Sequence, residues 1–509
     1  MSADRPDILL IQADQLSAAA LGAYGNRVVD APHLDALAGA GVVFDRAYCN
    51  SPLCAPSRAS MLAGALPSEI GTYDNAAELP AAVPTFAHRL RTAGYRTALV
   101  GKMHFVGPDQ LHGFEERLTT DVYPADFEMV PDWRLPDDRR LPWYHDTRSI
   151  GGATVSTATL QRDYDDEVTF HTRRTLTDVA RARARGDERP FLLVASFIAP
   201  HDPYEPPQEH WDRYADVEID LPATHGEPAA RDAHSRRLRA MCQLDAHPPT
   251  DDEVRRARRG YYGCVSYLDD QVGAVLGALD ELDLSAGTVV VFTSDHGDML
   301  GERGLWYKMS PFEGSARVPL VVRAPGRFAP GRVARTVSLV DLLPTFAELA
   351  GAGAGPPGAG TSLVGLLDGV EAGWPDRAVI EYLAEGVRAP QLTLVRGRWK
   401  LVHCPGDADL LFDLDADPHE LTDLAGDPVH AERLAELRAD LLAGRDLEDL
   451  AARVRRSQDA RRLVHAALTT GRATAWDYRP HERSSEAYVR GDFWTAIEHG
   501  RLGAARVEP

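Results

Sequence analysis

The sequence predicts an α/β fold, a large mixed β-sheet sandwiched by helices, with a smaller C-terminal subdomain and a tail. Three observations lead to this fold class. Apolar runs without polar alternation, typical of strands buried on both faces, alternate with helical patterns along most of the chain. Chemically active polar residues directly follow four of these runs. Short strand-like segments come only after a glycine-rich stretch at residues 351–360.

The first predicted strand covers residues 7–12 (DILLIQ) and is apolar throughout. It leads into Asp14 and Gln15, which places a carboxylate at the carboxyl end of the strand. Open α/β sheets bind their ligands at this edge. Further buried strands are predicted over residues 97–100, 191–197, 288–293 and 320–322, with helices over residues 85–93 and 261–282.

Polar side chains follow the next strands in the same way. Lys102 and His104 come after residues 97–100, His201 comes after 191–197, and Asp295 and His296 come after 288–293. Because parallel strands end at one edge of a sheet, this recurrence predicts a single shared site.

The C-terminal part of the chain has a different pattern. The segment GAGAGPPGAG resembles a linker, and strand-like segments over residues 378–382, 392–396, 399–403 and 410–413 predict a small antiparallel sheet. From about residue 417 to about residue 470 the chain is polar and helical. We therefore predict a catalytic α/β domain (1–375), an antiparallel-sheet subdomain (376–445) and a helical, oligomer-forming extension (446–509).

The end of the chain is aromatic and irregular. Exposed aromatic patches are uncommon on monomers, so we expect this tail to dock on another surface. Its aromatic residues are Trp476, Tyr478, Tyr488, Phe493 and Trp494.

Composition excludes several classes of protein. The 509 residues are 44 % hydrophobic and 26 % charged, which is ordinary for a packed protein and excludes disorder and collagen-like structure. The net charge of −21 argues against nucleic-acid partners. Apolar runs stay far below the ~20 residues of a membrane span. The chain enters its first strand without a basic region or cleavage site, so we expect a cytoplasmic protein. Five scattered cysteines argue against a disulfide framework.

Lysine is rare in this chain. Arginine supplies 52 of the 55 basic residues, and the lysines are Lys102, Lys308 and Lys400. We infer a GC-rich genome, under which a surviving lysine indicates a position where a compact ammonium is needed. Chance survival is the alternative for any one of them. Lys102 and Lys308 lie in chemically sensible neighbourhoods, which strengthens the functional interpretation for these two.

Residues 51–71 (SPLCAPSRASMLAGALPSEIG) carry the most specific motif. Cys54, Pro56 and Arg58, followed by Ser60 and Gly64, resemble the signature of the sulfatases, a family with an alkaline-phosphatase-like fold. The resemblance implies that a formylglycine-generating enzyme oxidises the cysteine to Cα-formylglycine, whose hydrated aldehyde is the nucleophile. One hydroxyl of the diol attacks sulfur, and the other expels sulfate as the aldehyde re-forms. For Cys54 taken alone, the alternative to a catalytic role is an ordinary buried cysteine that packs as an apolar residue.

The resemblance also implies one divalent metal ion beside residue 54. Its candidate ligands are Asp14, Gln15, Cys54, Asp295 and His296, the last two in the sulfatase-like segment SDHGD. Carboxylate oxygens favour Ca²⁺, the expected ion, or Mg²⁺ or Mn²⁺, and the histidine admits Mn²⁺ or Zn²⁺. Gln15 departs from the usual pair of adjacent aspartates and removes one negative charge. For Asp14 alone, a helix cap is the structural alternative.

Three residues are predicted to act around the nucleophile. Arg58 lies one helical turn after Cys54 and is expected to orient the diol. Lys102 is expected to neutralise a sulfate oxygen, and His104 to take the proton from the diol.

A second group is predicted to act on the leaving side of the ester. His201 is the candidate acid for the leaving alcohol, Lys308 the second sulfate clamp, and Asn75 a hydrogen-bond donor to a sulfate oxygen. Each residue alone is as readily a solvated cation or a loop histidine. A net charge of −21 repels an anionic ester, so clustered cations are required.

Three segments extend the resemblance to the choline sulfatases: residues 66–78, 101–127 and 476–491. That family implies a cytoplasmic homodimer or homotetramer whose C-terminal extension reaches a neighbouring subunit's active site.

A choline pocket requires aromatic faces and a carboxylate. His145 and Glu385 match the family, whereas Met129 stands where the family has tryptophan, and the usual acidic run is absent at Asp492-Phe493-Trp494. Tyr123 or Trp494 is expected to supply an aromatic face instead.

The sequence thus predicts a sulfuric-ester hydrolase that converts choline-O-sulfate to choline and sulfate. Alternatives are another small alkyl or aryl sulfate, or a phosphonate monoester or phosphodiester as substrate, which Gln15 also suits. A non-catalytic binder of sulfated metabolites is a further alternative, and the intact set of catalytic residue types argues against it.

Overall fold

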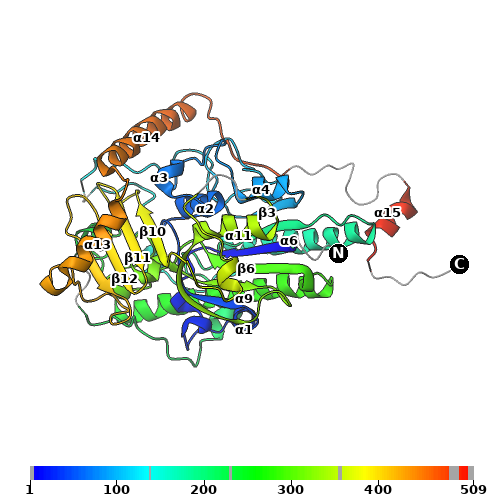
Figure 1. Ribbon diagram of the computed structural model, residues 1–509, viewed down its shortest axis with the longest axis horizontal. Helices are drawn as coiled ribbons and strands as arrows, with labels where there is room; N and C mark the ends of the chain where they lie inside the picture. Colours follow the sequence, from blue (N-terminus) through cyan, green and yellow to red (C-terminus); the bar gives the residue numbers. More distant parts are fainter. Residues whose placement is uncertain (1–4, 137–138, 228–231, 354–357, 481–491, 503–509) are drawn as a thin grey trace.

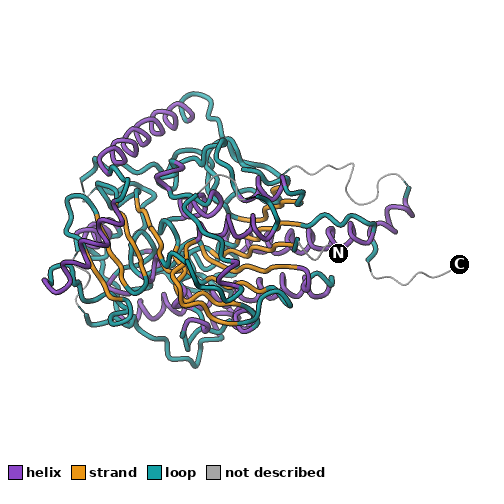
Figure 2. The backbone as a smooth tube through the Cα atoms, in the orientation of Figure 1, coloured by secondary structure: helices purple, strands orange, loops and turns teal. Residues whose placement is uncertain are grey.

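A nine-stranded mixed sheet lies at the centre of the computed structural model, between two groups of helices (Figure 1, Figure 2). The structure describes residues 5–136, 139–227, 232–353, 358–480 and 492–502. The strand order is β4-β3-β5-β1-β6-β8-β2-β7, and β9 pairs with β2. A separate four-stranded sheet follows. The predicted fold class is confirmed.

The parallel half of the large sheet contains the strands that the apolar runs predicted. β1 (Asp7–Ala13) is buried along its whole length between β5 (Phe191–Ser196) and β6 (Thr288–Ser294). β3 (Arg96–Gly101) pairs with β5, and the short β4 (Glu116–Arg117) pairs with β3. The four longer strands run in the same direction, so their carboxyl ends meet at one edge.

The other half of the sheet is mixed. β8 (Leu320–Arg323), which was predicted, is antiparallel to β6 and to β2 (Val42–Tyr48). β7 (Arg317–Val318) is antiparallel to β2, and β9 (Gly331–Ser338) is parallel to it. The sequence pattern missed β2 and β9 because charged residues interrupt both strands.

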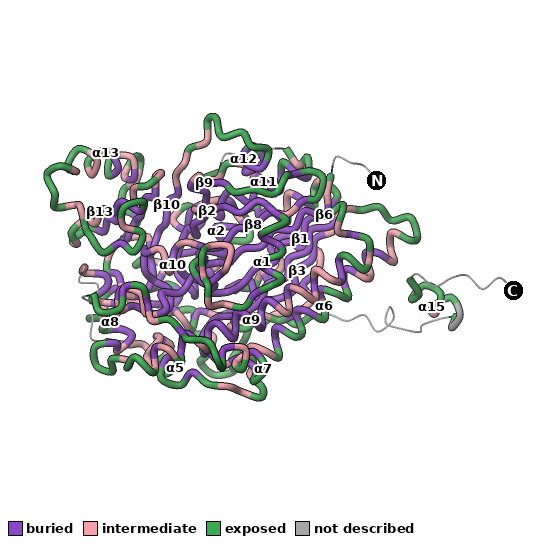
Figure 3. The backbone as a smooth tube through the Cα atoms, turned by 90° about the horizontal axis from the view of Figure 1, so that it is seen from below, coloured by how far each residue is buried: buried purple, intermediate pink, exposed green. Residues whose placement is uncertain are grey.

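Helices cover both faces of the sheet, as Figure 1 and the burial pattern in Figure 3 show. α2 (Cys54–Ala63), α4 (Phe86–Thr92) and α11 (Leu342–Leu349) contact one another on one side. On the other side, α9 (Asp251–Glu281) contacts α1 (Pro32–Gly39) and α6 (Leu160–Ala184). α9 begins ten residues before the predicted helix, at a capping box formed by Thr250 and Glu253.

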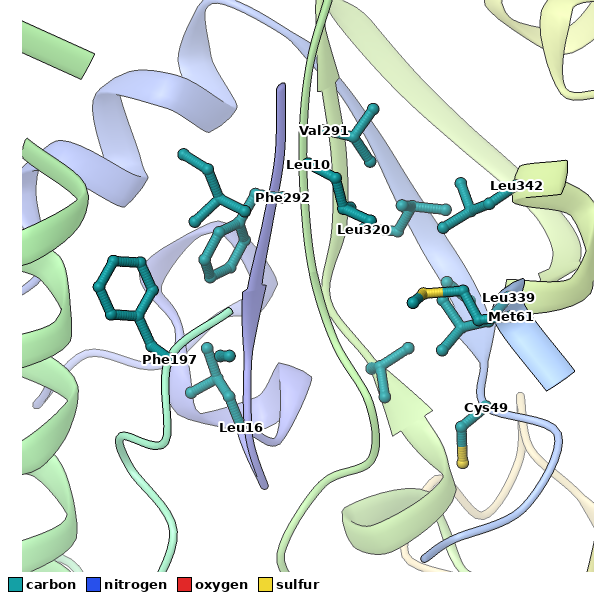
Figure 4. Packing of buried hydrophobic residues seen from close by; sticks show 14 of the residues in the cluster. Leu10, Leu16, Cys49, Met61, Phe197, Val291, Phe292, Leu320, Leu339 and Leu342 are labelled. Carbon is teal, nitrogen blue, oxygen red and sulfur yellow. The ribbon is translucent and has the colours of Figure 1, made fainter. Parts of the chain in front are cut away.

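The core packs α2 against the sheet (Figure 4). Met61 of α2 lies beside Leu339 and Leu342, and all three are fully buried. Burying a side chain of this size stabilises the fold by about 1.5–3 kcal/mol. These contacts fix α2, whose first residue is Cys54, relative to the strands.

The C-terminal sheet consists of antiparallel strands, as predicted: β10 (Arg377–Tyr382), β11 (Gln391–Arg396), β12 (Trp399–His403) and β13 (Leu410–Asp413). The helical region, however, starts later than predicted, at α13 (Ala431–Leu442), followed by α14 (Leu447–Leu468). The segment from residue 414 to residue 427 forms turns, which suit its glycine, proline and aspartates. The domain boundaries at residues 375 and 445 stay predictions.

Shorter helices complete the described chain: α3 (Pro67–Ile70), α5 (Arg148–Gly151), α7 (Gln208–Asp212), α8 (Ala233–Met241), α10 (Glu313–Ala316), α12 (Val364–Leu367) and α15 (Phe493–Gly500). All five cysteines are buried and unpaired, which confirms that no disulfide framework exists. Among the described residues, no helix has the length and apolar character needed to cross a membrane.

Candidate active site

The residues that directly follow four neighbouring strands lie together in one site, as the sequence predicted. β1 ends before Asp14, β3 before Lys102, and β6 before Asp295. Lys102 forms an ion pair with Asp14, and Arg58 of α2 bonds both Asp14 and Asp295. His201, which follows β5, joins the site through Lys308.

Cys54 lies at the first position of α2 and is 1 % exposed. Its Sγ is 3.2 Å from His296 Nε2, 3.7 Å from Lys102 Nζ and 3.9 Å from Asp14 Oδ1. Burial alone raises the pKa of the thiol, but the charges of Lys102, Lys308 and His296 lower this pKa well below its ordinary value. The surroundings of residue 54 therefore stabilise a negative charge at this position.

Arg58 ties α2 to the strand ends. Its Nε donates to Asp295 Oδ2 at 2.8 Å and its Nη2 to Asp14 Oδ2 at 3.0 Å. Its Nη1 donates to the Lys102 carbonyl at 2.6 Å. The guanidinium thus holds two carboxylates in place, and the predicted role in orienting the diol stays a prediction.

Asn75 holds the backbone at the first turn of α2. Its Oδ1 accepts the backbone N–H of Ala55 at 3.0 Å, beside Cys54. The adjacent Asp74 is fully buried and bonded by Arg461 of α14, so the C-terminal helix reaches this segment too.

A donor set suited to a divalent cation surrounds residue 54. The potential ligand atoms of Asp14, Cys54, Asp295 and His296 lie within 4.8 Å of one another, and all four residues are buried. His296 Nδ1 contacts the Gly297 carbonyl at 3.0 Å, which leaves Nε2 facing the set. Two carboxylates and an imidazole fit Ca²⁺, Mg²⁺ or Mn²⁺.

Gln15 lies beside this donor set in a different network. Its Oε1 accepts from Lys308 Nζ at 2.5 Å, and its Nε2 donates to Asp298 Oδ2 at 2.7 Å. Its backbone φ of 64° is in the left-handed region, which is strained for a residue with a Cβ. The metal role of Gln15 stays a prediction, because its oxygen is bonded to Lys308 here.

Lys102 and His104 are joined by Tyr123. The Lys102 Nζ lies 4.6 Å from the centre of the Tyr123 ring. The same ring stacks on His104 with centroids 4.8 Å apart. Burial raises the pKa of Tyr123 to about 12, so its hydroxyl is neutral near pH 7.

His201 and Lys308 form a second pair of contacting side chains in the site. The Lys308 Nζ lies 2.6 Å from His201 Nε2, and His201 Nδ1 lies 2.7 Å from the Asp202 carbonyl. His145 Nδ1 is 3.5 Å from Asp202 Oδ2, and its ring stacks on Tyr307 at 4.5 Å. Burial lowers the pKa of His145. The structure therefore brings His145 to the catalytic residues.

Glu385 presents a carboxyl group without a protein partner for one oxygen. It is 4 % exposed, and among the described residues Oε2 accepts no hydrogen bond. Burial and the charge of Asp74 raise its pKa to about 7. It lines a cavity together with Trp133 and Tyr144.

The substrate contacts expected of Met129 and Trp494 stay predictions. Met129 packs against a small hydrophobic cluster of Ala76, Val106, Phe127 and Val130. The side chain of Trp494 falls outside the described part of the structure.

Sequence reasoning missed several site residues. Asp202 and Asp298 bind Gln15, and Asp121 accepts the backbone N–H of His104. Asp202 directly follows His201, and Asp298 closes the segment SDHGD, so their positions carried a signal.

Three family profiles match the chain. The profile described as Sulfatase covers residues 6–352, more than half of the chain. The chain belongs to the sulfatase family. It is therefore a sulfuric ester hydrolase. The profile for the C-terminal part of N-sulphoglucosamine sulphohydrolase matches residues 301–446, and the one for the choline sulfatase enzyme C terminal matches residues 452–498.

Individual relatives agree with this family. A choline-sulfatase of Rhizobium meliloti is 46 % identical over 497 residues, which cover 96 % of each chain. An arylsulfatase of Clostridium perfringens is 29 % identical, over 86 % of this chain and 94 % of its own. The phosphonate monoester hydrolase of Agrobacterium radiobacter superposes with a TM-score of 0.67 at 24 % identity, over 88 % of this chain and 96 % of its own. This last likeness shows a shared fold.

Proposed function

We propose that this sulfatase hydrolyses choline-O-sulfate to choline and sulfate. The observation that carries the proposal is the 46 % identity to a choline-sulfatase along nearly the whole of both chains. The choline sulfatase profile matched at residues 452–498 also supports it.

We infer that the nucleophile is Cα-formylglycine made from Cys54 by a formylglycine-generating enzyme. When present, this group supplies a hydrated aldehyde whose hydroxyl attacks the sulfur of the ester. The residues of this chain would orient the nucleophile. Asn75 holds the backbone at the start of α2, and Arg58 holds the carboxylates that face residue 54.

Asp14, Asp295, His296 and residue 54 would hold one divalent metal ion, with Ca²⁺ expected and Mn²⁺ or Mg²⁺ as alternatives. Such an ion would supply positive charge next to the nucleophile and the sulfate oxygens. Lys102 and Arg58 balance the carboxylates in this buried site.

Cations and histidines would then carry out charge neutralisation and proton transfer. Lys102 and Lys308 neutralise the sulfate oxygens as charge develops. His104 takes a proton from the side of residue 54. Lys308 Nζ donates to His201 Nε2, so the proton for the leaving alcohol is held between these two groups.

Glu385 provides the carboxylate that a quaternary ammonium needs. The aromatic ring of Tyr144 lies in the same cavity, and the stacked pair of His145 and Tyr307 lies beside His201. Cation–π contacts with such rings contribute about 0.5–2 kcal/mol each. These groups support a cationic leaving group even though Met129 packs elsewhere.

The test compares four esters with protein shown by mass spectrometry to carry formylglycine at position 54. We expect kcat/KM for choline-O-sulfate to exceed that for the neutral isostere 3,3-dimethylbutyl sulfate by roughly 100-fold. The matched control Cys54→Ala should release no sulfate. Faster turnover of 4-nitrophenyl sulfate would instead assign an aryl sulfatase. Faster turnover of a phosphonate monoester would favour the phosphonate hydrolase that Gln15 also suits.

We further propose a cytoplasmic homodimer or homotetramer held by the C-terminal extension. The profile match at residues 452–498 supports a dedicated role for this region. Light scattering on the full chain and on a chain ending after residue 475, which lacks the aromatic tail, measures the assembly size directly. A monomer at micromolar concentration would contradict the proposal.

A further inference from the structure

The His104 imidazole is held in an unusual way. The residue is buried, and among the described residues no oxygen or nitrogen atom lies within hydrogen-bond distance of either ring nitrogen. The ring lies against Tyr123 and next to the Cys54 thiol. Its orientation therefore depends on the contact with Cys54, on stacking and on the backbone that carries it.

That backbone is in a conformation that needs support. His104 has a φ of 58°, in the left-handed region that a residue with a Cβ adopts only when its surroundings impose it. Asp121 supplies the support. Its Oδ2 accepts the backbone N–H of Met103 at 3.2 Å and that of His104 at 2.9 Å.

Asp121 is itself fixed from several directions. Arg117 Nη2 donates to the same Oδ2 at 2.6 Å, and the N–H of Val122 donates to Oδ1 at 2.9 Å. Arg117 is 2 % exposed and also donates to Gln110 Oε1 at 2.5 Å. A carboxylate with this many donors is a rigid anchor.

The C-terminal tail closes over this anchor. The Tyr478 ring lies 5.4 Å from the Arg117 guanidinium, and Asp477 Oδ1 accepts the N–H of Ala125 at 3.0 Å. Trp476 packs edge-on against Phe127. The tail thus covers the loop that carries both Asp121 and Tyr123.

We propose that Asp121 is a positioning residue for His104, which it holds through backbone N–H groups while Tyr123, two residues later, orients the ring. The inference rests on the proposed role of His104 in proton transfer. A carboxylate bonded to the ring would occupy one ring nitrogen. By bonding the backbone, Asp121 leaves both ring nitrogens available to the reacting groups.

The test is a double-mutant cycle of Asp121→Ala and His104→Ala in the full chain carrying formylglycine. We expect Asp121→Ala to lower kcat by roughly 30–100-fold, with KM changed less than about threefold. In the His104→Ala background the same change should lower kcat by less than about threefold. An equal loss in both backgrounds would show that Asp121 does not act through His104.

The loop itself provides a matched control. Asp109 accepts the N–H groups of Leu111 and His112 in the same loop, away from the site. Asp109→Ala should leave kcat within about twofold of the parent. If Asp121→Ala fails to fold, Asp121→Asn keeps an acceptor oxygen and should lower kcat by roughly tenfold.

A crystal structure of the Asp121 variant separates this proposal from the proposed substrate. We expect the His104 φ to leave the left-handed region and the His104 ring to move away from Tyr123. An unchanged His104 would overturn the positioning role whatever ester the enzyme hydrolyses. Conversely, a displaced His104 in an enzyme that does not hydrolyse choline-O-sulfate would uphold the positioning role and refute the substrate.

Discussion

The three lysines of this chain are all buried, yet they lie in two opposite kinds of surroundings. Lys400 of β12 lies between Glu313 and Glu420, with both carboxylates 2.7 Å from its Nζ, and it also donates to the Pro311 carbonyl. Lys102 instead pairs with Asp14, and Lys308 bonds Gln15 and His201, in a site where other groups are left without partners. The ring nitrogens of His104 and one oxygen of Glu385 have no oxygen or nitrogen partner in the described chain.

This difference distinguishes a structural charge from a functional one. A buried ammonium is costly unless counter-charges surround it, and the two glutamates of Lys400 supply them fully. At the active site the protein instead gathers Lys102, Lys308 and Arg58 around residue 54 and retains positive charge for an anionic substrate. The rarity of lysine predicted positions where a compact ammonium is needed, and the neighbouring groups distinguish the surroundings of Lys400 from those of Lys102 and Lys308.

The largest expected effect is that of Lys102→Met. Because this ammonium lies 3.7 Å from the position of the nucleophile, its loss should lower kcat/KM by roughly 10³-fold, beyond any fall in melting temperature caused by the loss of its ion pair with Asp14. Sulfate release and thermal unfolding measure the two quantities. Lys102→Arg is the control, since a planar guanidinium does not replace a compact ammonium. Near-normal activity of that variant would contradict the point-charge interpretation.

Removal of the metal ion should come next in size. Treatment with a chelator should lower activity by at least roughly 100-fold, and Ca²⁺ should restore it better than Mg²⁺. Metal content is measured by mass spectrometry alongside the assay. Full activity at negligible metal content would contradict the proposal that Asp14, Asp295 and His296 hold a metal ion needed for catalysis.

Lys400→Met should affect stability instead of catalysis. Removing the cation that lies between the buried Glu420 and the half-buried Glu313 should lower the free energy of unfolding by about 3–5 kcal/mol. The kcat per folded molecule should stay within about twofold. Urea denaturation measures the change, and the double variant Lys400→Met/Glu420→Gln should recover part of it. A large fall in kcat at unchanged stability would show that Lys400 has a functional role and would contradict its assignment as a structural charge.

The smallest effect is a pH dependence from Glu385. Its pKa is raised to about 7, so the carboxyl group is neutral below that pH and charged above it. A cationic leaving group binds the charged form, so KM for choline-O-sulfate should fall by up to roughly tenfold from about pH 6 to about pH 8. The neutral isostere should show no such trend, and Glu385→Gln should abolish it. A KM that rises over this range would exclude Glu385 from the pocket.

The sequence predicted the parts of the fold and site whose signal is local. β1, β3, β5 and β6 are continuous apolar runs, and each is followed at once by its chemical residues. The edge of a parallel sheet then brings Asp14, Lys102 and Asp295 together without further information.

What the sequence did not predict depends on distant partners. β2 and β9 contain charged residues in mid-strand, and their pairing joins segments nearly 300 residues apart. Asp121 acts on backbone groups, which leave no side-chain motif. The packing of Trp476 against Phe127 is likewise a contact between remote segments. The aromatic tail was expected to dock, and its residues Trp476 and Tyr478 do so on this chain's own loop.

The burial of Cys54 sets an order of events for the proposed maturation. Because only 1 % of the residue is exposed at the start of a packed helix, a modifying enzyme would not reach it in the folded chain. The proposed oxidation of Cys54 would therefore precede the packing of α2, while residues 51–71 are still extended and accessible. A chain that folded before this oxidation would be stable and well packed, and it would lack the proposed nucleophile.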